Sequence, residues 1–154
     1  MSNISKQRAS TLIEVLIAVS VIASVLTAVS AMISMSIKVS DSNEKKQLAL
    51  QKAQEALEFF RKERSINSWH NFSTPLVDGS HYCVSALPEG IASMSAKLGF
   101  CSNNDVLEAA RYEFKREAVI NFYGVNSVNV QIDMAWTDGS KAKTLTLQQS
   151  FENY

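Results

Sequence analysis

The chain has 154 residues, 46% of them hydrophobic, and its 15 lysine and arginine residues balance its 15 aspartate and glutamate residues. A balanced charge provides no overall electrostatic attraction to nucleic acid. The length suits one small domain, but an uncharged run near the amino terminus leaves only the residues from about Asp41 onward for a water-soluble core.

The first nine residues (MSNISKQRA) are polar and contain Lys6 and Arg8 but no acid. They precede an apolar run, residues 10–39. Positive charge before an apolar segment keeps that end of the chain in the cytoplasm. We therefore expect a single-pass membrane protein whose amino terminus is cytoplasmic and whose residues from Asp41 onward lie outside.

The apolar run contains no charged residue from Val15 to Ile37. At about 1.5 Å per residue, this stretch forms a helix of roughly 35 Å, which spans a bilayer core of about 30 Å. A secretory signal has a shorter apolar centre, of about 7 to 15 residues. The length therefore favours a retained transmembrane helix over cleavage after Ala31.

Small side chains are frequent in this run, and they let membrane helices approach closely. The pattern indicates a helix that packs against copies or relatives; a plain membrane anchor is the alternative. The small residues are Ala18, Ser20, Ala23, Ser24, Thr27, Ala28, Ser30, Ala31, Ser34 and Ser36.

One carboxylate, Glu14, stands near the entrance to the apolar run. A charge that faces lipid costs at least a few kcal/mol unless it lies near the interface or finds a partner. Two interpretations follow. Glu14 either forms an ion pair inside a helix bundle or lies at headgroup level near Arg8.

The residues RASTLIEVLIA, from Arg8 to Ala18, resemble the type IV pilins and the pseudopilins of type II secretion systems. In that family a prepilin peptidase removes a short basic leader after a small residue, usually glycine. The new first residue, usually phenylalanine or methionine, is N-methylated, and the fifth is glutamate. The resemblance implies cleavage between Ala9 and Ser10, methylation of Ser10, and a role for Glu14 in subunit assembly.

Residues 41–66 predict an amphipathic continuation of the same helix, because charge returns without a proline or glycine before Pro75. We expect one helix from about Ser10 to Ser65, whose second half is covered by a domain. The expected apolar stripe has three-four spacing. It consists of Leu50, Ala53, Leu57 and Phe60, with Ala49 and Ala56 beside them.

Residues 65–80 carry turn signals, and a short strand is expected from His81 to Leu87, before Pro88. A helical turn is expected near Ser95. Cys83 and Cys101 predict one disulfide if this part is exported, with two free thiols as the alternative.

The two histidines have no matching carboxylate or thiolate spacing. We therefore expect no metal site, and His70 and His81 are interpreted as surface imidazoles.

The last third predicts three antiparallel strands. The first is residues 111–122 and the second is Ser127–Trp136, which alternates strictly between apolar and polar residues. Asp138-Gly139 predicts a tight hairpin into the third. With these two as the loop, Ile132 would face Leu145 and Val130 would face Leu147.

These elements predict an α+β fold in which the long amino-terminal helix packs on a small antiparallel sheet, the pilin-like architecture. The turn AWTDGS before an alternating strand is also similar to the end of a minor pilin or pseudopilin. The expected organisation is a leader (1–9), a transmembrane or filament-core helix (10–40), an amphipathic helix (41–66) and a head (67–154) that ends in a three-stranded meander.

The sequence contains no catalytic motif and indicates no enzyme and no cofactor. We expect a structural minor subunit of a type IV pilus-like or type II secretion-like filament, whose partners are prepilin peptidase, other pilin subunits and the inner membrane.

The alternative is a membrane-anchored binding module, for instance one that binds DNA in a competence-type filament. It would use a cluster of Lys115, Arg116, Lys141 and Lys143, although lysines at a sheet edge also prevent edge pairing.

Overall fold

The computed structural model describes residues 4–153, with side chains from residue 12 onward. Helix α1, Ile4–Ile66, has 63 residues and confirms the expected long helix. Its continuity follows from the absence of glycine and proline before Pro75, since these two residues interrupt helices most strongly. The chain divides into two compact units, Met1–Asn43 and Glu44–Tyr154, and α1 contributes to both.

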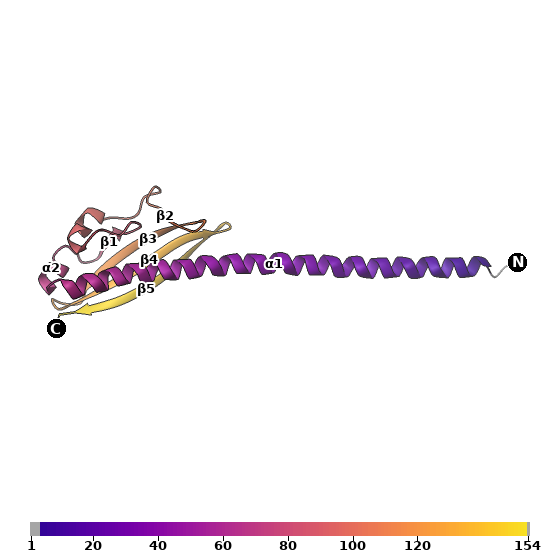
Figure 1. Cartoon of the computed structure of the whole chain (residues 1–154), viewed down its shortest axis with the longest axis horizontal. Coiled ribbons are helices and arrows are strands. Elements are labelled where there is room, and N and C mark those ends of the chain that lie inside the picture. Colours follow the sequence, from indigo (N-terminus) through magenta and orange to yellow (C-terminus); the bar gives the residue numbers. More distant parts are fainter. Residues whose placement is uncertain (1–3, 154) are drawn as a thin grey trace. The chain divides into compact units, whose positions relative to one another are not determined.

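Within the second unit, the carboxyl-terminal part of α1 lies along the sheet (Figure 1). It buries a narrow stripe of side chains against the sheet. Ala49, Ala53, Ala56 and Phe60 are fully buried, and their spacing of four, three and four residues follows one helix face. Leu50 was expected in this stripe but is 38% exposed. The stripe runs through Ala49 instead, one position earlier, because the alanines allow the helix backbone to lie close to the strands.

A short helix, α2 (Trp69–Ser73), follows α1. The hydroxyl of its N-cap residue Ser68 accepts a hydrogen bond from the Asn71 N–H, a common way to satisfy a helix start. Phe72 is buried and brings α2 onto the core, where its ring lies 5.6 Å from that of Phe151.

The second unit contains one five-stranded antiparallel sheet, larger than the expected three-stranded meander. Its main path has the order β1-β3-β4-β5, and β2 also pairs with β3. The strands are β1 (Ser80–Cys83), β2 (Leu107–Ala109), β3 (Tyr112–Phe122), β4 (Ser127–Asp138) and β5 (Lys141–Glu152).

Strand β4 confirms the alternation that its sequence predicts. The side chains fully buried between α1 and this strand are Val128, Val130, Ile132 and Met134. The polar residues between them lie on the opposite face, as the pleat of a strand requires.

The hairpin between β4 and β5 differs from the expected register by two residues. Asp138 pairs with Lys141, so the loop is Gly139-Ser140, and Ile132 faces Leu147 rather than Leu145. Gly139 has φ 62°, a positive value that glycine adopts easily at the first position of a type II′ turn.

The segment between β1 and β2 is mostly irregular. Strand β1 ends at Cys83, so the expected strand as far as Leu87 is wrong beyond that residue. The expected helical turn near Ser95 is confirmed as a 3₁₀ helix, η1 (Ile91–Lys97), which buries Ile91 and Met94.

Candidate functional site

The first unit presents an apolar surface along α1. The large apolar side chains from Leu12 to Val39 are each at least 47% exposed. The helix contains an 18-residue window of mean hydropathy 2.5 and is therefore long and apolar enough to cross a membrane, by length and composition. Burial of such a surface requires a lipid environment or other helices.

Hydroxyl groups within this surface hydrogen-bond to the carbonyl oxygens of their own helix. For example, Ser24 Oγ donates to the Val21 carbonyl at 2.7 Å, and Ser30 Oγ donates to the Leu26 carbonyl at 2.8 Å. Ser20, Thr27 and Ser34 do the same. Because these five donors are satisfied locally, they can enter an apolar environment without losing their hydrogen bonds.

The structure places Glu14 on this helix with its side chain exposed. The side chains of Ala9 and Ser10 lie outside the described residues, as do residues 1–3 of the expected leader. Glu14 lies on the same side of the helix as Ile17, three residues later, which is 57% exposed. A partner that covers this surface therefore also covers the carboxylate.

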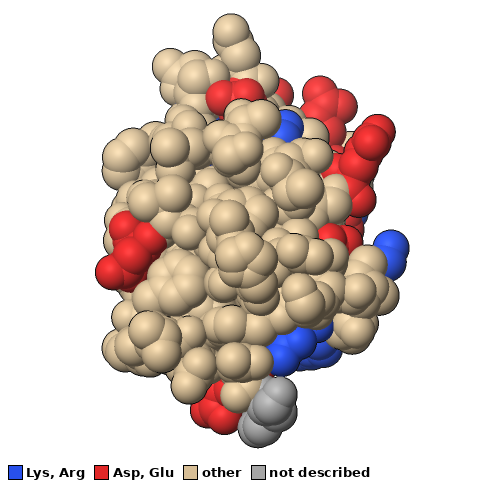
Figure 2. All heavy atoms as spheres, turned by 90° about the vertical axis from the view of Figure 1, so that its left-hand side faces the viewer, with Lys and Arg blue, Asp and Glu red and all other residues tan. Residues whose placement is uncertain are grey.

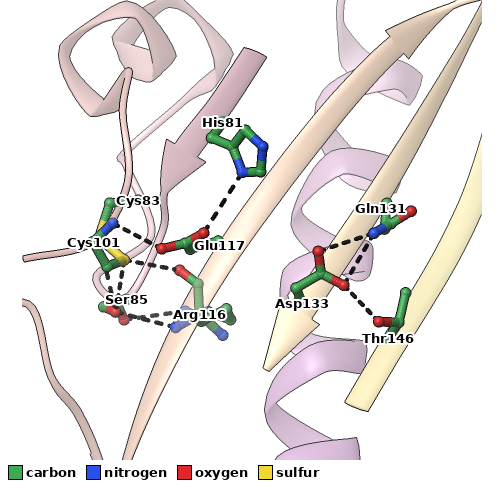
Figure 3. A network of polar contacts seen from close by, with 9 residues as sticks. All are labelled: His81, Cys83, Ser85, Cys101, Arg116, Glu117, Gln131, Asp133 and Thr146. Atoms are coloured by element: carbon green, nitrogen blue, oxygen red, sulfur yellow. Dashed lines mark hydrogen bonds and ion pairs between the residues drawn. A yellow bond between two sulfur atoms is a disulfide. The ribbon is translucent and has the colours of Figure 1, made fainter. Parts of the chain in front are cut away.

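The second unit contains the predicted disulfide between Cys83 and Cys101, with an S–S distance of 2.01 Å. It joins the end of β1 to the loop that follows η1 (Figure 3). Ser85 Oγ lies 3.5 Å from the Cys101 sulfur and donates to the Asp105 carbonyl at 2.8 Å. The Cys101 N–H donates to the Glu117 carboxylate at 2.9 Å. These contacts fix the loop against β3.

Arg116 lies beside this network and is 1% exposed, a burial that sequence reasoning missed. Its Nε donates to the Val84 carbonyl at 2.8 Å and its guanidinium also reaches the carbonyl of Ser85. Burial lowers the pKa of Arg116, and the Glu55 carboxylate at 3.8 Å opposes that shift. The alternation of β3 placed this residue inward, but its charge argued against burial.

The buried position of Arg116 removes it from the expected basic cluster with Lys115, Lys141 and Lys143. Lys115 instead donates to Asn103 at 2.9 Å. The face of the molecule in Figure 2 has an uncharged centre, with basic side chains in separate places and acidic ones at its rim. On this face the basic side chains do not form one continuous surface, and the beginning of β5 lies on the far side of the view.

The two histidines differ in their surroundings. His70 is exposed in α2, as expected. His81 is not a simple surface imidazole, because its Nδ1 is buried 3.6 Å from Glu117 and its ring centroid lies 4.2 Å from that of Phe100. In the part of the chain that the structure describes, no three histidine, cysteine or acidic side chains are grouped as metal ligands.

Comparison with known proteins identifies one family model, the prokaryotic N-terminal methylation motif, at residues 4–30. No curated protein and no solved structure matches the chain. The matched residues include Ala9, Ser10 and Glu14, and from Leu12 onward they overlap the exposed apolar surface of α1. The long helix and the five-stranded antiparallel sheet are consistent with a pilin-like α+β fold. The chain thus carries the methylation motif that is typical of type IV pilins and pseudopilins.

Proposed function

We propose that this chain is a minor subunit of a type IV pilus-like or type II secretion-like filament. It is inserted as a precursor with its amino terminus in the cytoplasm. A prepilin peptidase cuts between Ala9 and Ser10, and Ser10 is then N-methylated. The mature chain leaves the membrane as it packs, helix against helix, with other pilin subunits, while the second unit stays outside the cytoplasm.

The observation that carries this proposal is the methylation motif at residues 4–30, on a helical segment whose apolar side chains from Leu12 onward are exposed. A subunit that moves from lipid into a filament needs an apolar surface that either environment can cover. The satisfied hydroxyl groups of the segment suit both environments, since their hydrogen bonds do not depend on a neighbour.

Glu14 has a specific role in this proposal. Cleavage after Ala9 creates a positively charged amino group at Ser10, about one helical turn before Glu14. In a filament, the Ser10 amino group of one subunit approaches Glu14 of a neighbour that is shifted along the axis. Each charge alone is costly in hydrocarbon, so the pair favours one axial register.

The test is the intact mass and amino-terminal sequence of the full chain produced with a prepilin peptidase. We expect a chain that begins at Ser10 and carries one added methyl group. Ala9→Trp should block cleavage because its side chain does not fit a site for small residues, and Ala9→Gly is the matched control that should be cleaved. A native chain that still begins at Met1 beside an active peptidase would overturn the proposal.

A second measurement separates processing from assembly. Glu14→Ala should still be cleaved but should enter sheared filament fractions much less than the native chain. Glu14→Asp keeps the charge and should retain part of the incorporation. Equal incorporation of native and Glu14→Ala chains would show that the carboxylate has no role in assembly.

A further inference from the structure

Strand β5 forms an open edge of the sheet. It has 12 residues and pairs only with β4 in the described part of the chain. The strands on the other side of the sheet, β1 and β2, have only four and three residues. A long edge strand presents a row of unpaired backbone groups that another strand can bind, and a short one presents few.

The hydrogen-bond pattern identifies which groups of β5 point outward. Just beyond the two strands, the Asn153 N–H donates to the Asn126 carbonyl at 2.9 Å, so this opposed pair is a hydrogen-bonded one. Opposed residues of an antiparallel pair alternate between bonded and non-bonded positions. The register of β4 and β5 therefore turns the N–H and C=O groups of the even-numbered β5 residues away from β4. They belong to Ala142, Thr144, Thr146, Gln148, Ser150 and Glu152.

The helix occupies only one end of this row. Arg64 donates to the outward carbonyl of Glu152 at 2.9 Å, and Arg61 contacts the side chain of Gln149. From Ala142 to Ser150, no backbone hydrogen bond joins the outward groups to another described residue. The even-numbered side chains of this stretch are exposed. An open length of five outward-facing residues remains.

The usual protections of an edge strand are missing from the middle of β5. Residues 144–150 (TLTLQQS) contain no proline, glycine or charged residue. The pairing with β4 has no bulge between its first pair, Ser127 with Glu152, and its last pair, Asp138 with Lys141. Natural sheets discourage edge pairing with such features, so an edge without them is open to pairing with another strand.

The charged residues near the two ends of β5 limit which charges a partner strand can carry at its own ends. Lys141 and Lys143 are exposed at the beginning of β5. At the other end, Arg61 pairs with Glu58, and the acidic Glu152 lies near Arg64. Excess positive charge is therefore confined to the beginning of the strand. An antiparallel partner would place its carboxyl-terminal end there, where acidic side chains would meet the lysines.

We propose that β5 binds an extended segment of another polypeptide as an added antiparallel strand. The segment alternates apolar and polar residues and ends in acidic residues that face Lys141 and Lys143. Its apolar side chains extend the row formed by Leu145 and Leu147, which are only partly buried. Backbone hydrogen bonds supply the affinity and the acidic end sets the direction. This proposal does not depend on cleavage after Ala9.

The test uses the full chain in detergent micelles and a fluorescent probe peptide, Thr-Val-Thr-Val-Thr-Val-Glu-Glu, with binding followed by anisotropy at low salt. Gln148→Pro removes one outward N–H and places a ring on the edge, a position at which strands tolerate proline. We expect it to weaken binding at least about tenfold. Gln148→Val, the matched control, keeps the N–H and should bind like the native chain. Thr144→Pro repeats the test at a second position.

Two altered probes test the same interface without changing the protein. A probe that ends in Lys-Lys should bind more weakly, and the difference should shrink as salt rises. One probe is N-methylated on the backbone at its odd-numbered residues and another at its even-numbered residues. One of these probes should no longer bind and the other should bind normally, because only one of the two sets of N–H groups faces β5. Absence of probe binding to the native chain would overturn the proposal.

Equal binding by the native chain and by correctly folded Gln148→Pro and Thr144→Pro variants would also overturn it. The proposal would also be overturned if the native chain did not bind the probe but formed a dimer, and if Gln148→Pro abolished that dimer. That result would identify the occupant of the edge as β5 of a second copy.

Discussion

Arg116 Nη1 donates to the backbone carbonyl of Lys52 at 2.8 Å, so a side chain of β3 is hydrogen-bonded to the carboxyl-terminal half of α1. The same guanidinium also binds the carbonyls of Val84 and Ser85. One buried residue therefore connects the helix, the sheet and the loop after β1. Planar, multidentate contacts of this kind suit arginine better than lysine.

Replacement of Arg116 by methionine should destabilise the fold. The backbone carbonyls of Val84 and Ser85 would stay in place and lose their buried donor. We expect the free energy of unfolding to fall by about 3–5 kcal/mol, since each unsatisfied buried group costs on the order of 1–3 kcal/mol. Denaturant titration followed by tryptophan fluorescence measures this change. Arg116→Lys should recover only part of the loss, and a methionine variant as stable as the native chain would contradict the assigned contacts.

The buried carboxylate of Glu63 should hold the start of η1 against α1. It accepts the Ile91 N–H at 2.8 Å and an N–H of the Asn67 side chain at 3.2 Å. Glu63→Ala leaves the Ile91 N–H without an acceptor, which should cost about 1–3 kcal/mol. Glu63→Gln retains a carbonyl oxygen and should cost less. Hydrogen exchange of the Ile91 amide should accelerate in the alanine variant, and an unchanged rate would rule this role out.

The Cys83–Cys101 disulfide should stabilise the second unit through the loop it closes. The two cysteines are 18 positions apart, and a loop of that length contributes roughly 3 kcal/mol in the chain-entropy account. The double variant Cys83→Ser, Cys101→Ser should unfold at a lower denaturant concentration. Reduction of the native chain should shift the midpoint equally and leave the double variant unchanged. A midpoint that does not respond to reductant would contradict the prediction.

Asp105 should make stability depend on pH in the acidic range. Hydrogen bonds from the Ser102 hydroxyl and N–H lower the pKa of Asp105; desolvation opposes this shift, and the charges of Lys97 and Lys115 add to it. Since the folded state favours the ionised form, the stabilisation is fully present above the unfolded pKa of about 3.9. It is lost as pH falls from there through the lower pKa of the folded state.

The matched comparison is Asp105→Asn, which cannot ionise. The native chain should be more stable than this variant at pH 7, and the difference should shrink toward pH 3. Unfolding titrations at both pH values test the sign. A difference that grows in acid would mean that the carboxylate is not stabilised by Ser102.

The elements that depend on repeated patterns were predictable from the sequence. The alternation around Val130 and Ile132 predicted a strand with one buried face, and the helical spacing of Ala53 and Phe60 predicted the buried stripe of α1. These patterns repeat over several residues, so burial of one face satisfies all of them together.

The hairpin register was less predictable because a shift by two residues leaves every side chain on the same face. Leu145 and Leu147 point to the core in the expected register and in the observed one. Only a shift by one residue would have exposed them. The choice between the two registers depends on the loop, where Gly139 adopts the positive φ and Asp138 pairs with Lys141.

The contacts of Arg116 and Glu63 could not be predicted, because their partners are backbone groups far away in the sequence. Ile91 lies 28 residues after Glu63, and Lys52 lies 64 residues before Arg116. No pattern in the neighbouring sequence indicates which backbone carbonyl or N–H group needs a hydrogen bond from a distant side chain. For the methylation motif the situation is the reverse, since its residues are contiguous and recognisable without any structure.

The redox state of Cys83 and Cys101 can also show which compartment the second unit has reached. In a reducing cytoplasm both thiols react with a maleimide, whereas in an oxidising compartment the bridge protects them. Pulse labelling followed by alkylation would therefore measure when the second unit undergoes the export that we propose. The Cys83–Cys101 disulfide would thus report on the proposed export without a fused enzyme or tag.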